Sequence, residues 1–244
     1  MISGLTPPGA IPGDPAALLV ALPDVAHWLY ARSLLLSGRA RVRLGVAATA
    51  ALVVDPETAV LVGWPDAELL RETLAASPPG LALLVQEDAL VAVRAALPRW
   101  SVRPFVLHTL PQPYLPGTGS APGVIVSDPL DPAVLAGLPD DVRADSVGAP
   151  AAAVRVVDGV PVAVCAVSDL TETLWDVGVD TVEGSRRQGH ATATFLALAA
   201  AMATHGRQPV WAAYEDYTPS LALAARLGFR PVARMVELVP PNRG

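Results

Sequence analysis

The sequence predicts an α/β protein of two domains, and three features support this prediction. Short runs of β-branched and aliphatic residues alternate with segments of helical apolar spacing. Hydrophobic residues make up 52% of the 244 residues, so the chain can bury a large core. A stretch rich in Pro and Gly at 111–122 lacks periodicity. We therefore expect two domains, at 1–110 and 123–244, joined by this linker.

Composition narrows the classes of function. The formal net charge is −6 at pH 7 and the pI is about 5.1, which disfavours non-specific nucleic-acid binding. The one cysteine, Cys165, forms no intramolecular disulfide, and the scattered histidines predict no metal site. The first residues do not resemble a signal peptide, and the longest near-apolar stretch, 192–203, is too short for a bilayer. We expect a cytoplasmic protein without nucleic-acid or membrane partners.

The first half is expected to begin with helices and to continue with strands that alternate with helices. Asp14-Pro15 forms an N-cap with proline at the first helical position. Helical spacing continues to Leu36, with a break at Pro23 and a stop at Gly38. The further elements expected are strands 50–54 and 59–64 around a turn at 55–57, helix 65–76, strand 81–85, helix 87–97 and strand 100–108.

The second half is expected to begin with a strand and a short helix, at 124–126 and 131–138. Strands 152–157 and 160–167 are joined by Asp158-Gly159, the strongest short hairpin signal. The remaining expected elements are strand 174–181, helix 191–205, strand 209–213, helix 219–227 and strand 229–238.

The segment 177–191, VGVDTVEGSRRQGHA, carries the chemistry. A strand runs into a turn, and a long Ala-rich helix starts directly after it. Backbone N–H groups at a helix N-terminus are unpaired, and the helix dipole favours negative charge there. Arg186 and Arg187 add positive charge, while Gly189 lets an anion approach the backbone. These features predict a diphosphate cradle, and the alternative is a solvated basic turn.

Arg186-x-x-Gly189-x-Ala191 resembles the Q/R-x-x-G-x-G/A signature of the GNAT superfamily of acetyl-CoA-dependent N-acyltransferases. A second block, 216–229, is similar to the family's N-x-x-S helix that ends in L-G-F. The resemblance covers roughly 123–240 and leaves the first 110 residues unmatched. It implies a mixed, splayed β-sheet flanked by helices. The N-terminal part would then be an accessory α/β domain, possibly a degenerate acyltransferase half.

The resemblance also implies how acetyl-CoA binds, with no metal. The loop would wrap the CoA diphosphate, and the splayed fourth strand would pair with the pantetheine arm. The residues predicted to bind the co-substrate are Val179, Thr181, Arg186, Arg187, Gln188, Gly189, His190, Ala191, Thr192 and Ser220.

Asp176, on the fourth strand, is the predicted general base, because a carboxylate can take the amine proton directly or through water. Asp180, Glu172 and Glu215 are weaker candidates. The alternative for Asp176 is a polar residue at a strand edge that faces water. A backbone N–H on the splayed strand is expected to stabilise the oxyanion.

The sequence departs from the family pattern at two positions. The tyrosine that many members use to protonate the departing thiolate is replaced by Ala224. The family's asparagine is replaced by Tyr217, which we predict to be catalytic in place of that tyrosine, with Tyr214 as a second candidate. The alternative for Tyr217 is a first-turn residue that only packs against the co-substrate.

The expected function is therefore transfer of an acetyl group from acetyl-CoA to the amine of a small-molecule or peptide acceptor, directly, in a ternary complex. Two other functions stay open. One is a CoA-binding sensor or interaction module with weak catalysis, suggested by Ala224. The other is a structural α/β protein whose basic turn binds nothing. The identity of the acceptor and a homodimeric assembly are also left open.

Overall fold

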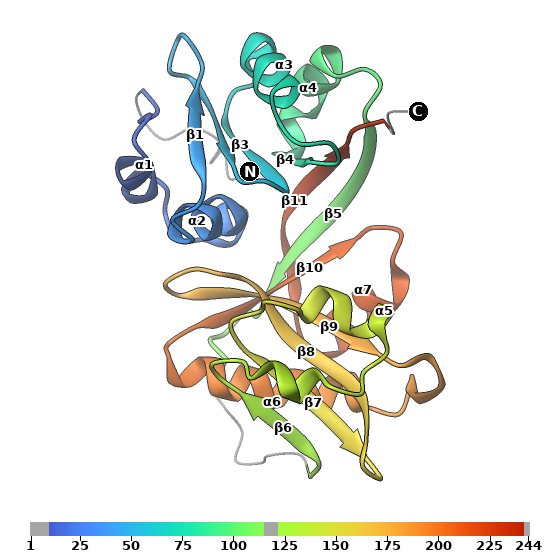
Figure 1. Ribbon diagram of the computed structural model, residues 1–244. Coiled ribbons are helices and arrows are strands. Elements are labelled where there is room, and N and C mark those ends of the chain that lie inside the picture. The colour runs from blue at the N-terminus through green and yellow to red at the C-terminus, as the bar shows by residue number, and fades with distance from the viewer. Residues whose placement is uncertain (1–9, 115–121, 242–244) are drawn as a thin grey trace. The chain divides into compact units, whose positions relative to one another are not determined.

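The computed structural model describes residues 10–114 and 122–241 (Figure 1). These residues form two compact units that are interleaved in sequence. The first unit contains the described residues up to Leu107, with Ala213–Tyr217 and the residues from Pro231 on. The second contains His108–Ala212 and Thr218–Arg230. The expected linker, 111–122, falls largely on residues 115–121, outside the described part, so its role stays a prediction.

The first unit is an α/β layer structure. Strands β1, β2 and β3 pair antiparallel, β4 pairs parallel to β3, and β11 from the chain's end pairs antiparallel to β4. Its elements are α1 (Pro15–Ala21), η1 (Ala26–Trp28), α2 (Leu29–Leu36), β1 (Arg41–Leu44), β2 (Ala50–Val54), β3 (Thr58–Gly63), α3 (Ala67–Ala75), β4 (Ala82–Gln86), η2 (Glu87–Ala89), α4 (Leu90–Ala96), the start of β5 (Ser101–Thr109) and most of β11 (Arg230–Val239).

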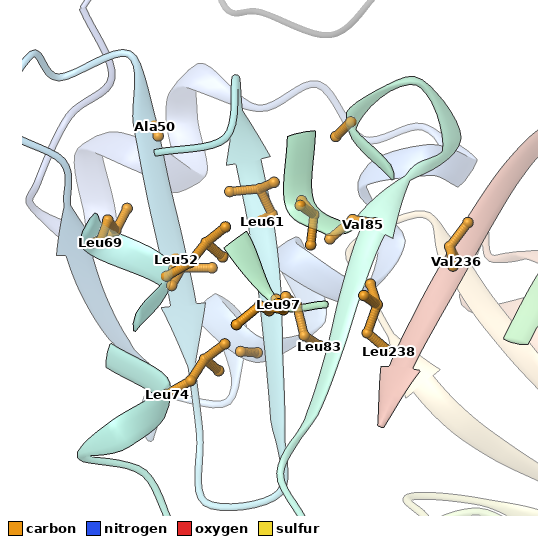
Figure 2. Packing of buried hydrophobic residues seen from close by; sticks show 14 of the residues in the cluster. Ala50, Leu52, Leu61, Leu69, Leu74, Leu83, Val85, Leu97, Val236 and Leu238 are labelled. Carbon is orange, nitrogen blue, oxygen red and sulfur yellow. The ribbon is translucent and has the colours of Figure 1, made fainter. Parts of the chain in front are cut away.

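The core of the first unit lies between its strands and the helices α3 and α4 (Figure 2). Leu52 and Leu61 on neighbouring strands pack with Leu70 and Leu74 of α3, and Leu238 of β11 extends the same cluster. Burying such side chains contributes about 1.5–3 kcal/mol each. The opposite face of these strands is contacted by α2.

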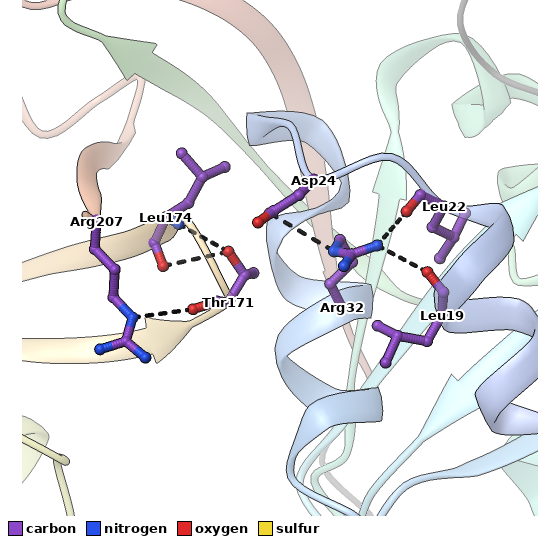
Figure 3. A network of polar contacts seen from close by, with 7 residues as sticks. All are labelled: Leu19, Leu22, Asp24, Arg32, Thr171, Leu174 and Arg207. Atoms are coloured by element: carbon purple, nitrogen blue, oxygen red, sulfur yellow. Dashed lines mark hydrogen bonds and ion pairs between the residues drawn. The ribbon is translucent and has the colours of Figure 1, made fainter. Parts of the chain in front are cut away.

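A buried arginine fixes the connection between α1 and α2 (Figure 3). Arg32 donates hydrogen bonds to Leu19 O, at 2.8 Å, and to Leu22 O. Its Nε lies 3.6 Å from an Asp24 oxygen. Backbone carbonyls at the end of α1 thus find a charged donor instead of water, which offsets the cost of burying them.

The second unit repeats the plan of the first. Each of the strands β6, β7 and β8 pairs antiparallel with the next strand in the chain, up to β9, and β10 pairs parallel to β9. Its elements are β6 (Val124–Ser127), η3 (Pro132–Leu135), α5 (Asp140–Arg143), η4 (Ala144–Ser146), β7 (Ala152–Val157), β8 (Val160–Leu170), β9 (Leu174–Thr181), η5 (Glu183–Ser185), α6 (His190–Thr204), most of β10 (Gln208–Tyr214) and α7 (Thr218–Arg226).

Two different layers cover the strands of the second unit. Phe195 of α6 stacks on Trp175, with ring centroids 6.3 Å apart, and meets Trp211 and Phe229 edge to face. On the other face, Leu135 and Val142 of the η3–α5 segment belong to a cluster with residues of β7 and β8. The helix α6 is therefore fixed against one face of β9, and the η3–α5 segment covers the other.

The α/β prediction is confirmed, and most expected elements are present. β2, β7 and β9 have the predicted bounds. The Asp158-Gly159 turn has φ of 49° and 79°, as a tight hairpin with both residues left-handed requires. The predictions omitted β1 and α5, which are short and polar. Among the described residues, no helix is both long and apolar enough to cross a membrane.

Candidate active site

The strands β9 and β10 of the second unit separate after a short paired stretch. Their parallel register runs from Leu174↔Gln208 to Asp176↔Val210. Beyond Asp176, in the described part of the chain, β9 continues to pair with β8 over Val177–Thr181 but not with β10. A parallel pair that stops while one strand continues leaves main-chain groups without ladder partners, as the splayed sheet predicts.

The paired end of these strands is held by polar contacts at the turn before β9 (Figure 3). Thr171 donates its N–H to Leu174 O at 2.9 Å, and Leu174 returns its N–H to the Thr171 hydroxyl at 2.9 Å. Arg207 Nε donates to Thr171 O at 3.3 Å, and Gln208 N–H donates to Thr173 O at 2.7 Å. The strands are thus fixed at one end and free to diverge at the other.

Alternation along β9 identifies the main-chain groups that face away from β8. Val182 N–H donates to Val162 O, so alternate residues before it, Asp180 among them, also bond to β8. The N–H and C=O groups of Val177, Val179 and Thr181 therefore point to the edge where β9 leaves β10. The two predicted strand contacts, Val179 and Thr181, are both in this set.

Asp176 lies where the separation begins. It is buried, with 7% exposure, and its Oδ1 accepts a hydrogen bond of 3.0 Å from Val177 N–H. The carboxylate is therefore held by the backbone of its own strand, at the residue where the parallel pairing of β9 with β10 ends. Its burial contradicts the alternative of a strand-edge residue facing water.

The segment 182–189 joins β9 to α6 and forms a largely exposed turn. Arg187 has φ of 61° and Gly189 has φ of 85°, so two left-handed residues occur within three positions. Such alternation turns successive N–H groups toward one point and makes an anion-binding concavity. Arg186 Nε bonds to Thr181 O at 3.2 Å, and Gln188 Nε2 bonds to Gly184 O at 3.3 Å, so side chains hold the turn.

The N-terminus of α6 is open. Its N-cap, Gly189, provides no side-chain cap, and the first intrahelical bond is donated by Ala193 to Gly189 O. The N–H groups of His190, Ala191 and Thr192 precede that bond and have no helical acceptor. A Cβ built at Gly189 meets nothing within 4 Å, so space is free above the backbone. These features fit a diphosphate.

A second carboxylate shares the sheet face of Asp176. Asp180 is four residues further along β9, and strand residues of equal parity share a face. Burial raises the pKa of Asp180 to about 6, the carboxylates of Asp145 and Asp141 add to the rise, and Arg186 opposes it. A carboxyl with this pKa exchanges protons near neutral pH, so Asp180 is a stronger base candidate than its sequence position suggested.

The other predicted residues have definite surroundings. Ser220 Oγ accepts a hydrogen bond of 2.9 Å from Trp211 Nε1, so it anchors α7 to β10. Ala224 is fully buried in the second unit. Tyr217 is 53% exposed and belongs to the first unit, and its catalytic role stays a prediction. Glu172 is exposed in the turn before β9.

Two alternative candidates are engaged in polar contacts within the first unit. Tyr214 donates to Glu237 Oε2 at 2.8 Å, and burial together with this bond raises its pKa to about 12. Glu215 accepts a hydrogen bond of 2.7 Å from Arg234 Nε. Both groups are less suited to proton transfer than Asp176 and Asp180, because Tyr214 holds its proton tightly and Glu215 is neutralised by an arginine.

The first unit lacks such a cradle at the corresponding place. Its helix α3 follows β3 after residues 64–66 only, and its N-cap is Asp66, whose Oδ1 accepts from Glu68 N–H and Leu69 N–H at 3.0 and 3.1 Å. A Cβ built at Gly45 would lie 2.8 Å from Asp66 Oδ2. A carboxylate of the chain thus occupies the position that an anion would need.

Comparison with solved structures identifies the fold. A GCN5-related N-acetyltransferase-like protein from Streptococcus suis superimposes with a TM-score of 0.64 at 18% identity, over 92% of this chain and 96% of that one. A GCN5-related N-acetyltransferase from Kribbella flavida gives 0.62 at 19% identity, over 88% and 93%. A tandem GNAT protein from the clavulanic acid biosynthesis pathway gives 0.51 at 16% identity, over 81% and 80%.

No protein-family model and no curated protein matches the sequence. The structural matches cover both units, so the chain has a GNAT-like fold along almost its whole length. The resemblance seen in the sequence of the second half is thereby confirmed for the fold. The same plan of an antiparallel meander, a helix and a parallel strand in the first unit agrees with a tandem arrangement.

Proposed function

We propose that the chain is an N-acetyltransferase that transfers the acetyl group of acetyl-CoA to the amine of a small-molecule or peptide acceptor. The transfer is direct, within a ternary complex. The observation that carries the proposal is the open, uncapped N-terminus of α6, with left-handed residues at Arg187 and Gly189, next to a strand that leaves its parallel neighbour. Acetyl-CoA, when bound, supplies an activated acetyl thioester.

The residues of the cradle bind the diphosphate of CoA in this proposal. The N–H groups of His190, Ala191 and Thr192 point at it along the helix axis, where the macrodipole favours negative charge. The exposed guanidinium groups of Arg186 and Arg187 neutralise it. The proposed reaction uses acetyl-CoA as co-substrate and no metal.

The main chain of β9 positions the rest of the co-substrate. Val179 offers an N–H and a C=O toward the edge left by β10, in the extended geometry that pairs with the amide groups of a pantetheine arm. A free N–H at this edge also suits a thioester carbonyl oxygen, because a fixed donor there needs no reorganisation.

Asp176 takes the proton of the acceptor amine in the proposed reaction. Its position at the end of the parallel pairing of β9 with β10 supports this role, and its bond to Val177 N–H fixes its orientation. Asp180 is the second candidate, because its raised pKa lets it exchange protons near neutrality. Tyr217 is proposed as the donor to the departing thiolate because it is an exposed phenol near in sequence to Ala224, the position that carries the tyrosine in many family members.

The proposal is tested by release of CoA thiol from acetyl-CoA with a panel of polyamines, amino acids, aminoglycosides and peptides. The chain contains no lysine, so acetylation of its own lysines adds no background. We expect turnover with at least one amine. In Asp176→Asn, kcat should fall by about 10²–10⁴-fold with unchanged acetyl-CoA affinity. Asp158→Asn, at a hairpin tip, is the matched control.

The buried Ala224 favours a second candidate function, a module that binds CoA without efficient catalysis. The side chain at position 224 is a methyl group, so it cannot protonate the departing thiolate. The same assay separates the two functions. Acetyl-CoA binding without turnover on any amine would contradict the enzyme and favour the module.

A further inference from the structure

A groove on the first unit lies between the strand β1 and the helix α3. We call it the arginine groove. It has a volume of about 670 Å³, in the range of small-molecule sites. Arg39, Arg41 and Arg43 line one side, and α3 lines the other with Glu72 and Thr73. None of the residues that the sequence analysis predicts to be catalytic or to bind acetyl-CoA lines this groove.

The strand register places two of the arginines on one face. Arg41 pairs with Val54 and Arg43 pairs with Leu52, and Leu52 belongs to the core cluster under α3. Paired residues share a face of a sheet, so both arginines rise on the side covered by α3. Alternate side chains on a strand are about 7 Å apart. Among the described residues, β1 is the outermost strand, so this row lies at the edge of the sheet.

The three guanidinium groups are available. In the described part of the chain, none of them takes part in an ion pair or a side-chain hydrogen bond, and all three side chains are exposed. Other arginines of the same unit, such as Arg32 and Arg234, have carboxylate partners. The row is therefore a concentration of unneutralised positive charge in a chain of net charge −6.

The carboxylates of the groove do not neutralise this row. Asp55 Oδ1 accepts hydrogen bonds of 2.8 and 2.7 Å from Glu57 N–H and Thr58 N–H, so it is engaged in the β2–β3 turn. Glu72 is exposed on α3. Apolar surface from Val54 and Leu69 also lines the groove. The result is a cationic wall beside a partly apolar floor.

We propose that the arginine groove binds a small molecule with two anionic groups, carboxylate or phosphate. The planar guanidinium fork matches both groups bidentately, and two forks on alternate residues of one strand suit two anions on a short carbon skeleton. The site is separate from the diphosphate cradle on α6, which belongs to the other unit.

A competing account exists for charges on an outer strand. Natural sheets use charged side chains at their edges to prevent pairing with another chain. On that account the arginines keep the protein from self-association and bind no ligand. The two accounts predict different effects of removing Arg41 and Arg43.

Isothermal titration of the full chain with citrate, and separately with inorganic pyrophosphate, tests the proposal at fixed ionic strength. We expect saturable binding of at least one, and the more tightly bound probe identifies carboxylate or phosphate. Arg41→Gln/Arg43→Gln should weaken it by about tenfold or more. Glu72→Gln should tighten it by about two- to fivefold, because a repelling carboxylate is removed.

The controls separate this site from general charge effects and from the cradle. Arg94→Gln/Arg226→Gln removes the same charge from exposed positions elsewhere and should leave binding unchanged. Arg186→Ala/Arg187→Ala should leave citrate binding unchanged, and pyrophosphate is titrated in this background because the cradle is itself expected to bind a diphosphate. Three results would overturn the proposal: no binding of either probe, equal weakening of citrate binding in either control, or self-association of Arg41→Gln/Arg43→Gln with unchanged ligand affinity.

Discussion

At the scale of single residues, the protonation of Asp180 links the site to stability. Its folded pKa of about 6 lies above the unfolded value of 3.8. A raised pKa contributes stability that is fully present below the unfolded pKa and is lost as pH rises through the folded pKa. Asp180 should therefore lower the free energy of unfolding above pH 6 and should leave it unaffected below pH 4.

Asp180→Asn should remove that penalty, because the amide resembles the protonated acid. We expect the variant to be more stable than the wild type at pH 8 by about 1–2 kcal/mol, after allowance for solvent screening, and equal to it at pH 4. Urea denaturation at both pH values measures this. A variant that is less stable at pH 8 would show that the ionised carboxylate is favourably held.

The backbone at Arg187 gives a second prediction at this scale. A non-glycine residue in the left-handed region is strained by about 1–2 kcal/mol. Arg187→Gly should relieve that strain and Arg187→Ala should keep it, so the glycine variant should be about 1 kcal/mol more stable than the alanine variant. Both lose the charge and should bind acetyl-CoA more weakly, by similar factors. Thermal melts and titrations compare the two, and equal stabilities would contradict the strain.

At the scale of elements, the N-cap of α3 is the feature that closes the first unit to anions. Asp66→Ala should cost about 1 kcal/mol, because two N–H groups lose their acceptor, and Asp66→Asn should retain most of the stability. Urea denaturation of the three proteins measures the difference. Equal stability of the alanine variant and the wild type would show that water replaces the cap without loss.

The sequence predicted elements well where periodicity was strong. β9 and the start of α6 followed from an apolar strand and a glycine before an Ala-rich helix, and these elements hold the predicted cradle. The strand β1 was not predicted, since its arginines alternate with apolar residues over only four positions. That Arg-Val-Arg-Leu alternation was the available signal for the arginine groove. The segment α5 was missed because it is four residues long.

The candidate site was predicted in part. Residues of the loop 182–189 are adjacent in sequence, so a local motif could identify them. The burial of Asp176 and the raised pKa of Asp180 depend on segments that fold over β9, among them Asp145 of η4. Local spacing carries no information on such contacts.

At the scale of the whole molecule, the chain contains two units of one plan that exchange segments. The last strand, β11, follows α7 of the second unit and pairs with β4 of the first. A sequence read in order suggests two consecutive domains, because strand exchange leaves no local signal. The two units differ at the helix N-terminus on which the proposed function depends, which is open at Gly189 in the second unit and capped by Asp66 in the first.

This asymmetry predicts that each chain binds one molecule of acetyl-CoA. Calorimetric titration of the full chain with acetyl-CoA, beside Arg186→Ala/Arg187→Ala, tests the central claim most directly. Asp158→Asn serves as the control. We predict a stoichiometry of one, with binding weakened by about 100-fold or more in the double variant, since two charge-assisted contacts are lost. No binding to the folded wild type, or binding that the double variant retains in full, would contradict the account.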